Sequence, residues 1–291
     1  MSLASQPVSE TAPSASRKVP RSPANNSLSE AEFGKFRDLI YAKAGIYLSP
    51  AKRSLVAGRL GKRVRHYGLA SFGEYYALAT VKGAHEELQT LVDLLTTNET
   101  YFFREPKHFE FLRSVAERAK GRGPFRVWSA AASSGEEAYS AAMCLASVLG
   151  STADWTVLGT DVSSRVLERA RRGHYALPCA KRIPEPHLRE YCLKGVRDQE
   201  GTFLIDPAIR RKVEFRQMNL NGTWNELPQF DVIFLRNVMI YFDQQTKRRL
   251  VDRLHGKLKP GGRLVIGHSE TLNAVSDRFE VIRPSMYRRK G

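Results

Sequence analysis

The sequence predicts an α/β protein whose sheet domain is preceded by an all-α domain. Between residues 29 and 95, apolar residues recur at helical spacing behind capping signals. From residue 125 onwards, short apolar runs alternate with helical segments, an order typical of a mainly parallel sheet with helices on both faces. Two short runs near the C-terminus, 279–284 and 285–289, predict a last pair of antiparallel strands.

The first 28 residues are predicted to be a disordered tail, because Ser, Pro, Ala and Asn dominate them and aliphatic residues are few. Ser29 and Glu32 then form a capping box ahead of a helix that Gly45 ends. The buried face of this helix is predicted to contain Phe33, Phe36, Ile40 and Ala44.

A second helix is expected to start with Ser49 as its cap and Pro50 at its first position. Its predicted apolar stripe is Leu55, Leu60 and Val64. Ser71 and Glu74 suggest a capping box for a third helix, and the run "AHEELQTLVDLLT" predicts a fourth. The helical domain is therefore expected to span residues 29–95.

Residues 96–106 are expected to link this domain to the sheet domain, residues 107–291. The predicted elements of the sheet domain, apart from the C-terminal pair, are helix 107–120, strand 125–130, helix 136–149, strand 155–160, helix 163–172, strands 213–217 and 230–235, helix 244–258 and strand 263–267. Residues 174–212 interrupt the alternation with several prolines, which predicts a small inserted β subdomain.

Composition narrows the class of protein. No apolar run is long enough to span a membrane and no signal core is present, so a cytoplasmic protein without membrane insertion is expected. The three cysteines lack metal-ligand spacing, and no metal is expected. The formal net charge of +16 indicates an acidic partner, which by charge alone is nucleic acid, an anionic membrane surface or an acidic protein.

The loop after the first strand has the layout of a nucleotide site but the wrong charges for phosphate. The run "FRVWSAAASSGEEAYS" reads as strand, loop and helix. Its loop has the single glycine Gly135, followed by Glu136 and Glu137, whereas phosphate loops are rich in glycine and often carry a lysine. A carboxylate in the first turn also favours the helix dipole, which accounts for one of the pair. Glu137 is the expected ligand contact, and Glu136 the residue that serves the helix start.

Asp161 lies at the carboxyl end of the second strand, in "GTDVSS". An acid at this position can accept hydrogen bonds from both hydroxyls of a ribose. The alternative is that it caps the following helix, although Ser163 and Ser164 are available for that role. A ribose without a phosphate cradle indicates an adenosyl group with no 5′ phosphate. S-adenosylmethionine fits, because the nearby carboxylates would attract its sulfonium and ammonium groups.

The linker run "LLTTNETYFFREPKHF" places Asn98, Thr100 and Arg104 among three aromatic residues. One interpretation is a linker helix with aromatic core contacts. The other is a segment that closes over a ligand, because clefts form preferentially at domain junctions. The residues alone do not choose between the two.

Five stretches together resemble the CheR family of chemoreceptor glutamate O-methyltransferases. They are, in order along the chain, "TTNETYFFRE", "RVWSAAASSGEEAYS", "LGTDVSSRVLERARRGHY", "LRNVMIYF" and "LKPGGRLVIGHSE". The resemblance covers roughly residues 29–289. The resemblance implies a helical domain followed by a Rossmann-like, S-adenosylmethionine-dependent methyltransferase domain with an inserted β subdomain. The implied product is S-adenosylhomocysteine, and the implied partner is the cytoplasmic helical domain of chemoreceptors, the methyl-accepting chemotaxis proteins.

Matching positions imply the site residues. The implied cofactor contacts are Asn98, Thr100, Arg104, Glu137, Asp161, Asn219, Leu220, Leu235 and Arg236. Arg104 and Tyr241 are predicted to orient the reactants, as catalytic residues. A glutamate side chain is ionised at neutral pH and needs no general base, in keeping with the absence of a Ser–His–Asp or Cys–His set.

A basic run in the second helix suggests how an acidic substrate docks. Its predicted docking residues are Lys52, Arg53, Arg59, Lys62 and Arg63. The alternative is an ordinary solvated surface. The resemblance implies that this helix contacts the acidic receptor bundle near its methylation sites.

Two other functions were weighed. A nucleic-acid methyltransferase would suit the positive charge, but enzymes that methylate base amino groups usually carry an Asp/Asn-Pro-Pro-aromatic motif where this chain has "RNVMIY". Nucleic acid is therefore not the expected partner. A non-catalytic S-adenosylmethionine-binding signalling module is the other alternative, although all the matched polar positions are occupied.

Overall fold

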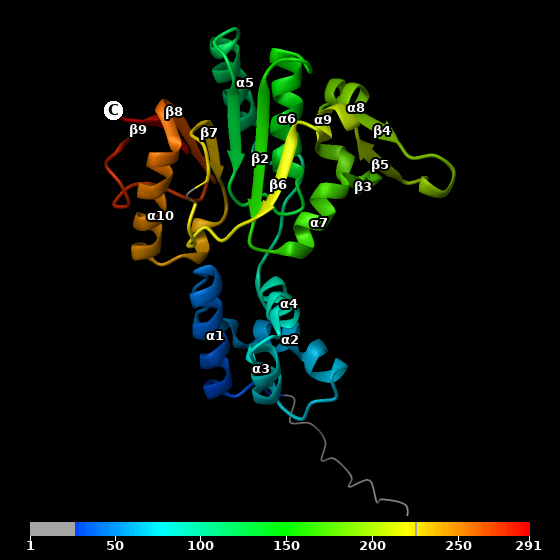
Figure 1. Ribbon diagram of the computed structural model, residues 1–291, viewed down its shortest axis with the longest axis vertical. Coiled ribbons are helices and arrows are strands. Elements are labelled where there is room, and N and C mark those ends of the chain that lie inside the picture. Colours follow the sequence, from blue (N-terminus) through cyan, green and yellow to red (C-terminus); the bar gives the residue numbers. More distant parts are fainter. Residues whose placement is uncertain (1–26, 225) are drawn as a thin grey trace, which may run out of the picture.

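The computed structural model describes residues 27–224 and 226–291. A four-helix domain lies below a larger sheet domain in Figure 1. Residues 1–26, most of the predicted tail, lie outside the described residues. Leu28, the last residue assigned to that tail, is buried in the helical domain, so the ordered chain begins before the predicted boundary. No helix in the described part is both long and apolar enough to cross a membrane.

The helical domain follows the predicted order. It contains α1 Glu30–Ala44, the 3₁₀ turn η1 Pro50–Lys52, α2 Arg53–His66, α3 Phe72–Thr80 and α4 His85–Leu95. The capping box of Ser29 and Glu32 is present, and Gly45 ends α1 in the left-handed conformation. The predicted buried face of α1 is confirmed.

Two details of the second helix were wrong. Ser49 makes no capping hydrogen bond with its side chain, and Pro50 opens η1 instead of α2. Leu55 is 36% exposed, whereas Val56 is fully buried beside Leu60 and Val64. The buried stripe therefore begins one residue later than predicted, which gives the regular four-residue spacing of one helix face.

The sheet has seven strands in the order β6-β2-β1-β7-β8-β10-β9. Their bounds are β1 Phe125–Ser129, β2 Trp155–Asp161, β6 Val213–Gln217, β7 Phe230–Leu235, β8 Leu258–Ile266, β9 Phe279–Arg283 and β10 Met286–Arg289. The first five strands of the spatial order are parallel, and β10 and β9 are antiparallel, as predicted. The chain passes from β1 outward to β2 and β6 and then returns to β7 on the other side of β1. This reversal opens a crevice at the carboxyl ends of β1 and β7.

Helices cover both faces of the sheet (Figure 1). One core contains residues of α5 Pro106–Ala119, α6 Glu136–Leu149 and α7 Ser164–Arg172. The other contains residues of α10 Gln244–Lys257 and of the loop around Trp224. The α/β fold expected from the alternating pattern is confirmed.

The inserted segment forms its own antiparallel sheet, in the order β3-β5-β4. Its elements are β3 His174–Ala176, η2 Leu177–Arg182, α8 Glu185–Tyr191, β4 Cys192–Lys194, η3 Arg197–Gln199, β5 Thr202–Ile205 and α9 Pro207–Arg210. The predicted β subdomain is therefore present. It projects from the side of the sheet domain in Figure 1.

The end of α1 is joined to the loop after β7. The backbone N–H of Tyr47 donates to the carbonyl of Tyr241 over 2.8 Å. The hydroxyl of Tyr41 donates to Asp243 over 2.6 Å. Gly45 lies between these contacts with φ of 72°, and a Cβ there would lie 1.9 Å from the Asn221 amide nitrogen. The chain therefore needs glycine here, both for the turn and for the approach of the two domains.

We expect Gly45→Ala to lower the free energy of unfolding by about 1–2 kcal/mol, because an L-residue is strained in this conformation. The clash with Asn221 adds to this cost unless that side chain moves. Gly58→Ala is the matched control, since Gly58 lies inside α2 with open space around its Cβ position. The control should be neutral or stabilising by up to about 1 kcal/mol. Urea denaturation measures both, and equal stability of the two variants would contradict the assignment.

Candidate functional site

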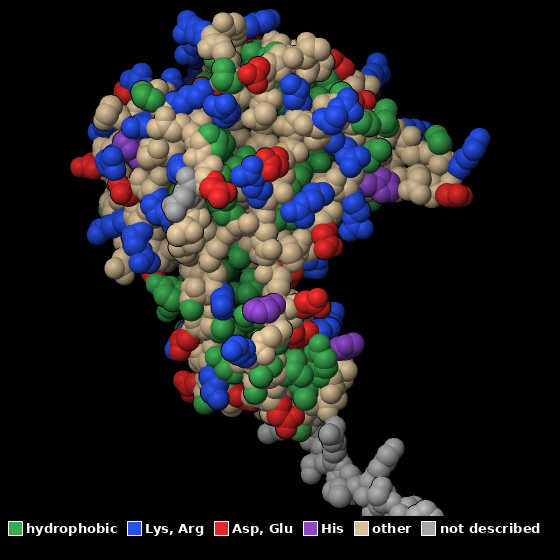
Figure 2. All heavy atoms as spheres, in the orientation of Figure 1, with side chains coloured by type: hydrophobic (Ala, Val, Ile, Leu, Met, Phe, Trp, Pro, Cys, Tyr) green, Lys and Arg blue, Asp and Glu red, His purple; other side chains and the backbone are tan. Residues whose placement is uncertain are grey.

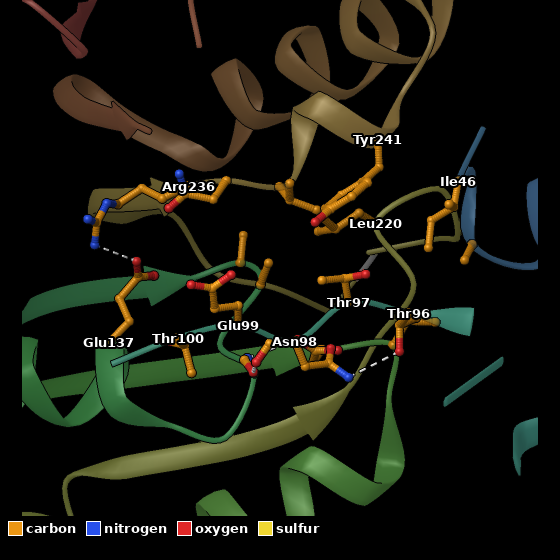
Figure 3. Close-up of a pocket in the computed structure, with 18 of the residues that line it drawn as sticks. Ile46, Thr96, Thr97, Asn98, Glu99, Thr100, Glu137, Leu220, Arg236 and Tyr241 are labelled. Carbon is orange, nitrogen blue, oxygen red and sulfur yellow. Dashed lines mark hydrogen bonds and ion pairs between the residues drawn. The ribbon is translucent and has the colours of Figure 1, made fainter. Parts of the chain in front are cut away.

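A cleft of about 940 Å³, including space open to solvent, lies at the carboxyl ends of β1, β2 and β7 (Figure 3). The linker forms one wall, and Ala44 and Ile46 reach it from the helical domain. Eight of the nine predicted cofactor residues line it: Asn98, Thr100, Arg104, Glu137, Asp161, Asn219, Leu220 and Arg236. Tyr241 lines it as well.

Leu235 is the predicted contact that does not line the cleft. Its side chain is fully buried in the core on the α10 face of the sheet. Any contact with a ligand would therefore have to come from its backbone, and its predicted role stays a prediction.

Asp161 is held in place at the end of β2. One carboxylate oxygen accepts from the Ser133 backbone N–H over 2.9 Å, and the other from the Ser163 N–H over 3.0 Å. Burial raises the pKa of this carboxyl, and the two backbone hydrogen bonds act in the opposite direction. Ser163, and not Asp161, caps α7, so the capping alternative is wrong. A carboxylate has about four acceptor positions, so these hydrogen bonds leave acceptor capacity for a ligand.

Glu137 and Arg236 form the charged end of the cleft (Figure 3). Ser129 donates to one oxygen of Glu137 over 2.6 Å, and Arg236 to the other over 2.8 Å. Arg236 also lies 3.1 Å from Glu105 and donates to the backbone carbonyl of Arg104. Although burial opposes it, Arg236 holds the pKa of the Glu105 carboxyl below its ordinary value. The pairing with Arg236 was not anticipated from the sequence, because the partners lie 99 residues apart.

Glu136 does not line the cleft. Its side chain is buried and accepts a hydrogen bond from Ser134 over 2.7 Å. Burial raises the pKa of this carboxyl. Glu137 thus lies at the cleft and Glu136 within the first turn of α6, whereas the ligand contact of Glu137 stays a prediction.

The charge of the lining suits a cationic ligand. Three carboxylates, those of Glu99, Glu137 and Asp161, face two guanidiniums, those of Arg104 and Arg236. One negative charge is thus in excess. S-adenosylmethionine carries a sulfonium, an ammonium and a carboxylate, and hence one net positive charge. The lining fits this group in charge, and Asp161 fits its ribose in hydrogen-bonding capacity.

The linker is an irregular segment, and so the linker-helix interpretation was wrong. Residues 97–105 contain no helix, and Phe103 and Glu105 have φ of 53° and 59°. The aromatic contacts with the core are present, because Phe102 and Phe103 are buried. These anchors hold the flanking polar residues Asn98, Thr100 and Arg104 at the cleft. The carbonyl of Asn98 accepts from the Ser133 hydroxyl over 2.9 Å, which ties the linker to the loop after β1.

Glu270 is a structural residue of the site that sequence reasoning missed. Its carboxylate accepts hydrogen bonds from the backbone N–H groups of Gly267, Asn237, Val238 and Met239, over 2.7, 2.9, 3.1 and 2.8 Å. Burial raises the pKa of this carboxyl. These bonds shape the turn after β7, in which Asn237 has φ of 58° and from which Tyr241 reaches the cleft. The available signal was an acid two residues after the "GH" at the end of β8.

Glu105, His108 and His268 form a group of potential metal ligands within the described part of the chain. Their nearest ligand atoms lie within 4.8 Å of one another. Glu105 already forms an ion pair with Arg236. Burial lowers the pKa of His108 to about 3, so its ring is neutral at neutral pH. His268, which follows the end of β8, is not among the residues that line the cleft.

The predicted docking residues of α2 divide into two groups. Arg59 donates to the carbonyls of Leu95 and Thr96 and to the Thr97 hydroxyl, over 3.0, 3.0 and 3.1 Å. Arg63 forms an ion pair with Glu87. Both arginines thus stabilise the helical domain and its linker. The exposed members of the set are Lys52, Arg53 and Lys62.

We expect Glu270→Gln to lower the free energy of unfolding by about 2 kcal/mol, because hydrogen bonds to a charged acceptor are lost and a buried amide group faces backbone donors. Thermal or urea denaturation measures the change. His268→Asn, two positions away and half exposed, should stay close to the wild-type protein. A loss in the control as large as in Glu270→Gln would argue against a special role for the Glu270 carboxylate.

Comparison with known proteins agrees with this architecture. Residues 31–96 match the family described as "CheR methyltransferase, all-alpha domain", and residues 98–288 match "CheR methyltransferase, SAM binding domain". The chain is 41% identical to the chemotaxis protein methyltransferase of Escherichia coli (strain K12), over 90% of this chain and 91% of that protein. It is 38% identical to chemotaxis protein methyltransferase 2 of Pseudomonas aeruginosa, over 88% and 92%. The chain therefore belongs to the CheR family of S-adenosylmethionine-dependent methyltransferases.

Proposed function

We propose that this protein methylates glutamate side chains of chemoreceptors, forming glutamyl methyl esters in chemotaxis adaptation. The observation that carries the proposal is the conjunction of both CheR domains with a cleft whose charge and polar groups fit S-adenosylmethionine. The partner would be the cytoplasmic helical domain of the receptor, which places the enzyme in the cytoplasm.

In the proposed site, Asp161 accepts hydrogen bonds from the ribose hydroxyls with the acceptor positions that Ser133 and Ser163 leave open. Asn98 and Thr100 contribute from the linker. Asn219 donates its side-chain amide to the carbonyl of Lys43 over 2.5 Å, so it connects the cofactor wall to the helical domain. The remaining predicted contacts are Arg104, Glu137, Leu220, Leu235 and Arg236.

The proposed chemistry needs little from the protein beyond positioning and exclusion of water. S-adenosylmethionine supplies the methyl group: a carboxylate oxygen bonds to it as the sulfur–carbon bond breaks, and S-adenosylhomocysteine is released. A glutamate of ordinary pKa is already ionised at neutral pH, so no general base is required. Correct positioning of two reactants is worth up to roughly 7–11 kcal/mol.

Arg104 and Tyr241 are the proposed orienting residues. Both line the cleft, from the linker and from the turn after β7 respectively. Arg104 donates one hydrogen bond to the Glu99 carbonyl over 3.0 Å and lies over the Tyr101 ring. Its other N–H groups are available to a substrate carboxylate, which a guanidinium binds with defined geometry.

For the receptor, we propose that three exposed residues, Lys52 of η1 and Arg53 and Lys62 of α2, contact its acidic surface. Arg59 and Arg63 add positive charge to the same region while their hydrogen bonds hold them in place. Neither alternative weighed from the sequence is favoured by a specific observation.

The proposal is tested by incubating the protein with labelled S-adenosylmethionine and cytoplasmic receptor fragments. We expect label in the receptor that mild base releases as methanol, the signature of a glutamyl ester. Transfer of label to nucleic acid instead, or absence of any acceptor, would refute the proposal.

We expect Arg104→Ala to lower methyl transfer at least about tenfold, because the substrate carboxylate loses a positioned donor. Arg182→Ala is the matched control: Arg182 also lies over the Tyr101 ring, at 5.0 Å, but is not among the residues that line the cleft. Initial rates of ester formation compare the two variants. Wild-type rates in Arg104→Ala would remove the residue from the mechanism.

A further inference from the structure

A second hollow lies beside the cofactor cleft, on the outer side of the linker. Three arginines of α7 line it: Arg165, Arg169 and Arg172. These three residues are called the α7 patch below. Thr96, Thr97 and Asn98 line both this hollow and the cleft, so the linker forms a wall between them.

The sequence of α7 dictates that these arginines share one face. Val166, Leu167 and Ala170 are buried, and the last two belong to the core of the sheet domain. The patch residues follow the spacing i, i+4 and i+7, which places them on one side of a helix. All three are exposed.

The positive charge of the α7 patch is largely uncompensated. Within the described residues, no carboxylate forms an ion pair with Arg165 or Arg172. Arg169 lies over the Tyr175 ring and 3.9 Å from Glu136, which is buried.

The acid that lines the hollow is also committed elsewhere. Asp93 of α4 is buried, and it accepts hydrogen bonds from Gln89, from the Ser164 hydroxyl and from the backbone N–H of Arg165. Its carboxylate thus joins α4 to the start of α7. The arginine side chains of the α7 patch are exposed to solvent, whereas the Asp93 carboxylate accepts hydrogen bonds from within the protein.

The positive surface continues onto α2. Arg59 lines the same hollow while it donates to the linker, and Lys62 follows three residues later on the same side of α2. On the face shown in Figure 2, Lys and Arg side chains gather over α7, just above the narrow junction with the helical domain. The α7 patch and α2 therefore flank the linker.

We propose that the α7 patch is a docking surface for an acidic helical segment of the receptor, which lies across the linker between α7 and α2. This inference rests on the proposed function, and it adds α7 to a surface that the sequence placed on α2 alone. From Arg165 to Arg172 the helix rises about 10 Å. Carboxylates two turns apart on a receptor helix are separated by about the same length. A partner held here lies against the wall of the cleft in which methyl transfer takes place.

The test is the double charge reversal R165E/R172E, with K120E/R122E as the matched control. Lys120 and Arg122 are exposed and lie just before β1, at the opposite end of the strand from the cleft. Both variants change the net charge equally. Arg169 is left unchanged because it contacts Tyr175 and Glu136.

The measurements are initial rates of ester formation against receptor-fragment concentration, and calorimetric binding of S-adenosylhomocysteine. In R165E/R172E we expect the KM for the receptor fragment to rise about tenfold, with kcat and S-adenosylhomocysteine affinity within about twofold of wild type, since charges at the rim of an interface act mainly on encounter. Higher salt should raise the KM of the wild type more than that of the variant. The receptor KM of R165Q/R172Q should lie between that of the wild type and that of R165E/R172E.

Three outcomes would overturn the inference. One is a receptor KM in R165E/R172E within about twofold of that in K120E/R122E, because the net charge of the protein would then explain the effect without a specific docking surface. Another is a loss of S-adenosylhomocysteine affinity in R165E/R172E as large as the rise in the receptor KM, which would make the α7 patch part of the cofactor site. If the wild-type protein forms no receptor ester, the proposed function fails and this inference with it, whereas ester formation that ignores α7 refutes the inference alone.

Discussion

The buried guanidinium of Arg236 holds together the parts of the cleft. Its side chain is 1% exposed and lies between Glu137 of α6 and Glu105 at the end of the linker. It also donates to the backbone carbonyl of Arg104. The end of β7, the first turn of α6 and the linker thus meet at one cation. Removing either carboxylate would leave a buried charge partly unpaired, which costs several kcal/mol. The cleft therefore depends on an ion-pair network that also sets its charge.

Much of the fold could be predicted because it follows from local pattern. The apolar runs predicted β6 and β7 with the bounds that the structure shows. The strand–loop–helix run predicted the position of Glu137, which lies at the cleft. Asp161 was predictable because the end of a parallel strand has a known function in such sheets. These features depend on residues close together in the chain.

The features that escaped prediction are long-range pairings of side chains. Arg59 and Arg63 appeared from the sequence as exposed docking groups, yet one holds the linker and the other pairs with Glu87. Glu270 binds a turn about 30 residues earlier in the chain. Helical periodicity distinguishes faces of a helix but does not say which neighbouring element a charged side chain meets. Ile46 reaches the cleft only because the two domains dock.

The cleft and the surface of this strongly basic chain carry opposite excess charges. Its cleft has an excess of carboxylates for a cationic cofactor, while its surface carries the positive charge that the proposed acidic partner would meet. Interactions between exposed charges are largely screened beyond about 8 Å at physiological ionic strength, which limits the reach of the surface arginines of α7. Inside the cleft, burial preserves the effect of Glu137 and Asp161 at short range. The linker is the physical partition: its polar groups face the cofactor cleft, and its outer side lies beside the basic helices. In the proposed arrangement, a partner held on that outer side lies close to the cofactor, and only the glutamate to be methylated has to enter the cleft.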